Sequence, residues 1–230
     1  MINTTINRKA TVKVARALGD LNDEVVFVGG AMVSLYIDSK GAEDVRPTKD
    51  LDLSFQITSL GQLELLRQKL VARGFSEARD QKAICRFTFE DLLVDVMSTQ
   101  AIGWAPANRW FKAGFDKAIS VAIEEQSINI LPLSYFLAAK LDAFFARGIN
   151  NPYTSRDMED IVYLFNYIDD IEDVMNQPDK TVNQYIQDSV LRMLSSASVL
   201  GAMSGHIYPA GNDEIMQHVL YQMKKLTHGL

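Results

Sequence analysis

In the first 131 residues, short hydrophobic runs alternate with polar turns. β-branched and aromatic residues fill these runs, which is typical of strands. We expect strands at residues 24–30 and 51–57, two strands joined at Glu90 and Asp91 within residues 85–98, and a hairpin over residues 117–131. A leucine-rich segment from Ser59 to Gly74 has the cap residue and the terminal glycine of a helix. The pattern predicts an α/β (α+β) domain over residues 1–131, with a mixed sheet and flanking helices.

After Pro132 the hydrophobic residues recur with the period of a helix. We expect one helix over residues 133–148, a second over residues 154–168 with Thr154 as its cap, and two more within residues 181–200 and 213–227. The chain is therefore expected to have a second, helical domain over residues 132–230.

The composition is that of an ordinary globular protein. Of the 230 residues, 47% are hydrophobic and 23% are charged, close to the globular average. The single cysteine, Cys85, cannot form an internal disulfide, and with three histidines it does not suggest a structural zinc site. No stretch approaches the roughly 20 apolar residues of a membrane helix, and the N-terminus lacks a signal-peptide pattern. We expect a cytoplasmic protein without membrane contact.

The net charge of -6 does not by itself indicate a nucleic-acid-binding protein, because such proteins usually carry a basic field. The acidic excess is uneven along the chain. Residues 1–130 hold 16 basic and 17 acidic side chains, whereas residues 131–230 hold 7 and 12.

Two aspartates stand at the start of the strand expected near residues 51–57. Asp50 and Asp52 are two residues apart, so both carboxylates lie on the same face of the strand, about 7 Å apart at the backbone. Like charges this close repel unless a cation lies between them. Oxygen donors without a nearby histidine or cysteine favour magnesium or manganese over zinc. The alternative is a solvent-facing strand end that happens to carry two aspartates.

A third aspartate, Asp95, lies within the hydrophobic run of residues 92–97. The run predicts a strand that is buried on both faces, where an ionised carboxylate is costly unless it is paired or coordinates a metal. Asp95 is therefore either a third metal ligand or the salt-bridge partner of a nearby arginine.

Gly29 and Gly30 interrupt the hydrophobic segment of residues 26–37, where a strand is expected to run into an apolar helix. Backbone amides at such a turn and at a helix N-terminus form an anion site, although a plain tight turn has the same sequence pattern. A phosphate site, a carboxylate pair and a later carboxylate are together what metal-assisted nucleotidyl transfer needs.

These residues resemble the nucleotidyltransferase superfamily typified by DNA polymerase beta and the kanamycin-type nucleotidyltransferases. Its signature is a Gly-Gly or Gly-Ser turn, an Asp-x-Asp strand and a later Asp. Residues 26–37 and 46–55 resemble, more narrowly, the opening motif of the AbiEii/AbiGii toxin family, in which an Arg and a Ser or Thr precede the Asp-x-Asp. The resemblance covers residues 25–165.

The resemblance implies a nucleotidyltransferase-type sheet and the transfer of a nucleoside monophosphate from an NTP, with Mg²⁺ or Mn²⁺ as cofactor. It implies the toxin half of a bacterial toxin–antitoxin or phage-defence pair, with tRNA as a candidate acceptor and a cognate antitoxin protein as partner. It assigns the metals to Asp50, Asp52 and Asp95, and the nucleotide to Gly29, Gly30, Thr48, Lys49 and Lys140.

The helical part carries a second charged motif. Lys140 and Arg147 share one helix face, and Asp157 and Asp160 share a face of the next helix. This arrangement resembles the C-terminal signature of the same family, which would place Lys140 on the nucleotide phosphates and Asp157 and Asp160 at the active site, in a cleft between the two domains. The alternative is an interhelical salt-bridge network that joins these residues and Arg156.

Two other functions remain open at this point. An antibiotic-modifying nucleotidyltransferase would use the same metal site, and the acidic C-terminal part would suit a cationic aminoglycoside. A non-catalytic protein-binding module on the same fold would not bind NTP in a metal-dependent way.

Overall fold

The structure is a computed structural model, and it describes residues 3–37, 45–48, 50–78, 85–102, 107–176, 179–207 and 212–227. The chain forms two compact units. The first comprises Met1–Ser34 and Glu43–Pro132, and the second comprises Leu35–Ala42 and Leu133–Leu230. The fold is mixed α/β with additional C-terminal helices, as the sequence predicts.

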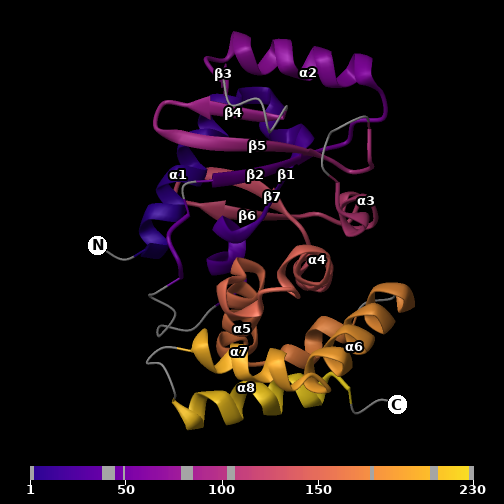
Figure 1. The fold of residues 1–230 in the computed structure, drawn as a ribbon. Helices are drawn as coiled ribbons and strands as arrows, with labels where there is room; N and C mark the ends of the chain where they lie inside the picture. Colours follow the sequence, from indigo (N-terminus) through magenta and orange to yellow (C-terminus); the bar gives the residue numbers. More distant parts are fainter. Residues whose placement is uncertain are drawn as a thin grey trace. The chain divides into compact units, whose positions relative to one another are not determined.

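The first unit is built on a seven-stranded mixed sheet with the strand order β3-β4-β5-β2-β1-β7-β6 (Figure 1). The strands are β1 (Val25–Val28), β2 (Asp50–Phe55), β3 (Ser76–Glu77), β4 (Arg86–Phe89), β5 (Leu92–Ser98), β6 (Ile119–Ile123) and β7 (Gln126–Ile130). β2 runs antiparallel to β1 and parallel to β5, which makes it a central strand. The expected strands are therefore present, and the pairs β4–β5 and β6–β7 are hairpins.

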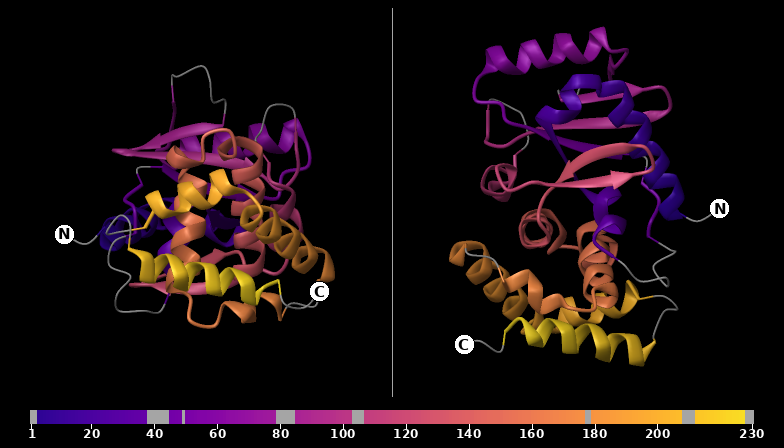
Figure 2. Two further views of the ribbon diagram at one scale, coloured as in Figure 1. Left: turned by 60° about the horizontal axis from the view of Figure 1, so that its bottom comes forward. Right: turned by 180° about the vertical axis from the view of Figure 1, so that it is seen from behind.

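The helices of this unit are α1 (Asn3–Leu18), α2 (Leu60–Ala72) and α3 (Arg109–Phe115), with 3-10 turns at η1 (Gly19–Glu24) and η2 (Gly30–Leu35). α1 lies against the face of the sheet that is turned to the viewer in the right panel of Figure 2. It buries the residues that recur on one of its sides, namely Asn7, Thr11, Val14, Ala15 and Leu18. The predicted helix between Ser59 and Gly74 is present, because the Ser59 side chain accepts a hydrogen bond from the Gln62 amide as its N-cap.

The second unit consists of helices around α4. Its elements are α4 (Leu133–Ala143), the π-helical turn η3 (Phe144–Gly148), η4 (Pro152–Thr154), α5 (Arg156–Tyr167), η5 (Ile171–Met175), α6 (Lys180–Leu194), α7 (Ala197–Gly205) and α8 (Asp213–Lys225). Every residue of α4 from Ser134 to Leu141 is buried, as expected for a helix surrounded on all sides. It packs against α5 and α6, and the ring of Tyr36 stacks on that of Phe136 with centroids 4.4 Å apart.

Four local predictions are wrong. The segment after Gly29 forms the short 3-10 helix η2, not a longer α-helix. The single helix expected within residues 181–200 is two, because Ser196 caps a new helix after α6 ends. The cap of α5 is Ser155, which accepts a hydrogen bond from the Met158 amide, and not Thr154. β5 is not buried on both faces, because burial alternates along it.

Among the described residues, no helix is both long and apolar enough to cross a membrane.

Candidate active site

The pairing of β2 with β5 brings the three predicted aspartates onto one face of the sheet. Asp52 lies opposite Asp95 in the parallel register, and Asp50 lies opposite Leu93, two residues earlier on the same face. The other face of the two strands carries buried apolar residues such as Leu53 and Val94. The hydrophobic side of each strand therefore anchors it in the core and leaves its carboxylates on the partly exposed side.

Gly29 lies directly beside the Asp52 carboxylate. Val28 pairs with Asp52 across β1 and β2, so the turn that follows β1 begins next to this side chain. Gly29 has a φ of 78°, in the left-handed region, and a Cβ atom added to it would overlap the carboxylate of Asp52. A glycine is needed at this position for both reasons. Gly30 then opens η2, and the Met32 amide donates back to the Gly29 carbonyl at 3.2 Å.

Arg86 is bound to Asp95 from the neighbouring strand. Its Nε and Nη2 donate to the two carboxylate oxygens at 2.7 Å each, which is the bidentate geometry of a strong charge-assisted pair. These bonds raise the pKa of Arg86, and the charges of Asp50 and Asp52 act in the same direction, while burial opposes them. The guanidinium is thus close enough to interact with all three aspartates.

Sequence reasoning named a nearby arginine as the alternative partner of Asp95 but did not identify Arg86. A signal was available. With a two-residue turn at Glu90 and Asp91, residues whose numbers add up to 181 lie opposite each other, and Arg86 and Asp95 satisfy this rule.

The donor set suits a hard divalent cation held in part by a substrate. No group of three or more His, Cys, Asp or Glu side chains in the described ranges is arranged to hold a metal ion by itself. Magnesium, however, is usually bound by one or two carboxylates together with substrate phosphates and water. Asp50 and Asp52 provide such a pair on one face of β2, whereas Asp95 is engaged by Arg86.

Thr48 lies just before the aspartate pair. Its hydroxyl donates to the Asp50 carbonyl at 3.1 Å and accepts from the Asp50 amide at 3.2 Å, so it fixes the backbone at the start of β2. Lys49, the other residue assigned to the nucleotide in this segment, lies outside the described residues.

In the second unit, Lys140 and the two later aspartates form a buried charged cluster. Lys140 on α4 is 8% exposed, and Asp157 and Asp160 on α5 are 4% and 3% exposed. The Lys140 ammonium lies 2.6 Å from Asp160 and 3.6 Å from Asp157. Arg147, whose side chain is 70% exposed, donates to both Asp157 oxygens at 2.7 and 3.0 Å. These contacts join four of the five residues of the interhelical network that the sequence left as an alternative.

The environment of Asp157 favours its ionised form. Burial alone would raise the pKa of Asp157, but the hydrogen bonds from Arg147 and the charge of Lys140 outweigh it and hold the pKa below its usual value. Its place in the first turn of α5 adds a favourable helix-dipole interaction.

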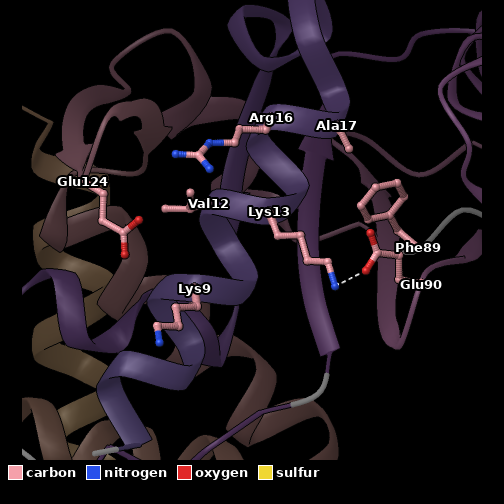
Figure 3. A pocket seen from close by; sticks show the side chains of 8 residues that line it. All are labelled: Lys9, Val12, Lys13, Arg16, Ala17, Phe89, Glu90 and Glu124. Carbon is pink, nitrogen blue, oxygen red and sulfur yellow. Dashed lines mark ion pairs between the residues drawn. The ribbon is translucent and has the colours of Figure 1, made fainter.

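A cavity of about 470 Å³ lies elsewhere in the first unit, along α1. Figure 3 shows three cations of α1, Lys9, Lys13 and Arg16, between Glu124 from one hairpin turn and Glu90 from the other. Lys13 forms ion pairs with Glu90 and Asp91, and Arg16 lies 3.7 Å from Glu125. None of the predicted site residues lines this cavity.

The comparison with protein families identifies the chain. The protein-family model described as "Nucleotidyl transferase AbiEii toxin, Type IV TA system" matches residues 14–197. The chain belongs to this family, so it is a nucleotidyltransferase with a role in a toxin–antitoxin system. The resemblance seen in the sequence is confirmed, and the match extends beyond residues 25–165 at both ends.

Solved structures that the chain matches include an antigenic nucleotidyltransferase-like protein from Paracoccidioides brasiliensis and a candidate nucleotidyltransferase from H. pylori. The first is 16% identical, with 85% of this chain and 92% of that chain covered and a TM-score of 0.48. The second is 14% identical, with 94% and 92% covered and a TM-score of 0.47. No curated protein matches the chain.

The contact between Gly29 and Asp52 leads to a first prediction. Gly29→Ala should lower the free energy of unfolding by about 1–3 kcal/mol and abolish transfer, because the new methyl group both strains the backbone and displaces the carboxylate. Gly74→Ala is the matched control: Gly74 also has a positive φ, of 89°, but its added Cβ would meet only the Phe89 ring at 3.8 Å. Urea unfolding and a transfer assay distinguish the two. Equal stability losses with activity retained in Gly29→Ala would contradict the close contact.

The lowered pKa of Asp157 leads to a second prediction. A carboxyl group whose pKa is lower in the folded protein stabilises the fold above its unfolded pKa of about 3.9, and this contribution is lost as the pH falls through the folded value. Asp157→Asn should therefore lower stability at pH 7 by about 1–3 kcal/mol, and the difference from wild type should shrink by pH 3. Urea titrations at both pH values test this, with the exposed Asp169→Asn as control. A difference that is the same at both pH values would refute it.

Proposed function

We propose that the chain catalyses metal-dependent transfer of a nucleoside monophosphate from an NTP to a hydroxyl acceptor. The acceptor oxygen attacks the α-phosphorus, the bond from this phosphorus to the bridging oxygen breaks, and pyrophosphate leaves with its electron pair. The hydroxyl proton passes to a base. The observation that supports this reaction best is the placement of three aspartates on one face of β2 and β5, beside the glycine turn.

In this proposal each group has one task. Asp50 and Asp52 would hold Mg²⁺ or Mn²⁺ together with the triphosphate, and the metal, when bound, would supply charge that neutralises the phosphates. The turn at Gly29 and Gly30 presents backbone amides to the phosphates. Thr48 and Lys49 contribute to the same nucleotide-binding site.

The proposed role of Asp95 is to orient and activate the acceptor hydroxyl. A carboxylate has about four lone-pair directions, and the bidentate bond from Arg86 uses two of them. The remaining ones can accept a hydrogen bond from a hydroxyl group. Arg86 holds the carboxylate in one orientation while it does so.

The acceptor that we propose is an RNA, with tRNA as the first candidate, and the biological setting is the cytoplasm of a bacterium that also makes a cognate antitoxin or uses the protein against phage. The family description, which names a toxin of a type IV toxin–antitoxin system, supports the cognate antitoxin. Incubation with each labelled NTP, magnesium and total RNA tests it, since label should enter one RNA size class.

A second candidate acceptor is a cationic antibiotic of the aminoglycoside class. The excess of 12 acidic over 7 basic residues in the last 100 positions favours such a ligand. The same assay with an aminoglycoside in place of RNA distinguishes the two. A chain that binds no NTP with or without magnesium would instead be a protein-binding module.

The aspartate pair provides the direct test of the reaction. Asp50→Asn with Asp52→Asn should reduce transfer to below about 1% of wild type, because the metal loses its ligands. Stability should change by less than about 1 kcal/mol, because removing two like charges relieves repulsion while Arg86 keeps Asp95 as its partner. Ser54→Ala, further along the same face, is the control for activity and stability. Retained NTP binding with a large loss of stability would show that the pair is structural.

A test of Lys140 must separate two roles: contact with the nucleotide phosphates, and neutralisation of the buried charges of Asp157 and Asp160. Lys140→Met alone should be destabilising, because it leaves Asp157 and Asp160 with less positive charge in a buried place. Adding Asp160→Asn should restore much of the stability. If Lys140 binds the nucleotide, the repaired double variant should still show a raised KM for NTP and a reduced kcat. Full recovery of both would mean that Lys140 serves the fold only.

A further inference from the structure

A buried asparagine of α1 binds the backbone segment that leads to the aspartate pair. Asn7 has no exposed surface, although it lies on the otherwise mainly apolar side of the helix. Its Nδ2 donates to the Arg46 carbonyl at 3.1 Å, and its Oδ1 accepts from the Thr48 amide at 3.0 Å. One side chain thus satisfies a backbone acceptor and a backbone donor two residues apart, as a neighbouring strand would.

These bonds continue to the site through Thr48. The amide of Thr48 is held by Asn7, and its hydroxyl is bonded to both the amide and the carbonyl of Asp50. Residues 45–48 have no regular secondary structure, so sheet pairing does not fix them. α1, which is distant in sequence, therefore sets the position at which β2 begins.

Burial of an amide side chain is costly unless all its groups are bonded, and an apolar residue would fill this place on α1 more simply. An asparagine at this position is explained by its two hydrogen bonds, which fix the backbone segment before Asp50. Its own backbone is also supported, because the Thr11 hydroxyl donates to the Asn7 carbonyl at 2.8 Å. Asn7 precedes residues 14–197, so the family match does not include it.

We propose that Asn7 is a positioning residue for nucleotidyl transfer, which acts by holding Arg46 and Thr48 so that Asp50 and Asp52 stand where the metal and triphosphate need them. This inference rests on the proposed function. It assigns no contact between Asn7 and the substrate. Its effect should therefore appear in kcat and in the magnesium requirement more than in the KM for NTP.

Asn7→Ala removes both bonds and should lower kcat by about 10²-fold, since small displacements of catalytic groups have effects of that size. The dissociation constant for Mg²⁺, measured by calorimetry with a non-hydrolysable NTP analogue bound, should rise, and the KM for NTP should change by less than about threefold. Val14→Ala is the matched control, because Val14 is fully buried on the same helix and makes none of these bonds. Its kcat should stay within about threefold of wild type at a temperature where both variants are folded.

Each outcome either supports or overturns the positioning role of Asn7. Equal kcat values for Asn7→Ala and Val14→Ala, with active wild type, would overturn the role of Asn7 and leave the proposed function intact. If Asn7→Ala does not fold, Asn7→Asp replaces it, because its carboxylate still accepts from the Thr48 amide but cannot donate to Arg46. A wild-type kcat in Asn7→Asp, or failure of both variants to fold, would count against positioning. Wild-type protein that transfers no nucleotide to any acceptor tried would instead overturn the proposed function, and the role of Asn7 with it.

Discussion

The parallel pairing of β2 with β5 concentrates negative charge on one face of the first unit. Asp52 and Asp95 lie opposite each other, and Asp50 lies on the same face two residues before. Carboxylates so arranged repel, and the sheet does not allow them to move apart because Leu51, Leu53, Val94 and Val96 are fixed in the core on the other face. The remaining features of the site compensate for this constraint or adapt to it.

Arg86 provides positive charge that partly offsets the negative charge of the three aspartates. It comes from β4, binds Asp95 with two hydrogen bonds, and lies within the electrostatic influence of Asp50 and Asp52. Both of these hydrogen bonds engage Asp95 alone among the three carboxylates. The divalent cation of the proposed reaction would take Asp50 and Asp52 as oxygen ligands together with the triphosphate. The glycine at position 29 is adapted to the fixed position of Asp52, because any side chain there would occupy the space of the Asp52 carboxylate.

The second unit compensates its buried charges differently. Lys140 and Arg147 balance Asp157 and Asp160, so the cluster has two charges of each sign. Three of the four residues are nearly inaccessible, and isolated charges in such a place would be very costly. A cluster of this kind specifies how α4 and α5 pack against each other. A structural role and the proposed nucleotide contact of Lys140 are separated by repairing the charge balance of the cluster.

The sequence by itself determined the strands, most of the helices and the candidate aspartates, because these depend on local periodicity, caps and the spacing of residues along one strand. The hairpin turn at Glu90 and Asp91 even contained the register that pairs Arg86 with Asp95. Hydrophobic periodicity over residues 181–200 did not show that Ser196 starts a new helix, although its bond from the Val199 amide is a local cap signal. Nor did it show that the segment after Gly29 is a 3-10 turn, because a short hydrophobic run does not distinguish this turn from an α-helix. Only the tertiary structure decided that β2 lies next to β5 and that Asn7 binds the backbone before Asp50. Contacts between residues about 40 positions apart leave no periodic trace in a single sequence, because nothing in the local pattern records which surfaces the folded chain brings together.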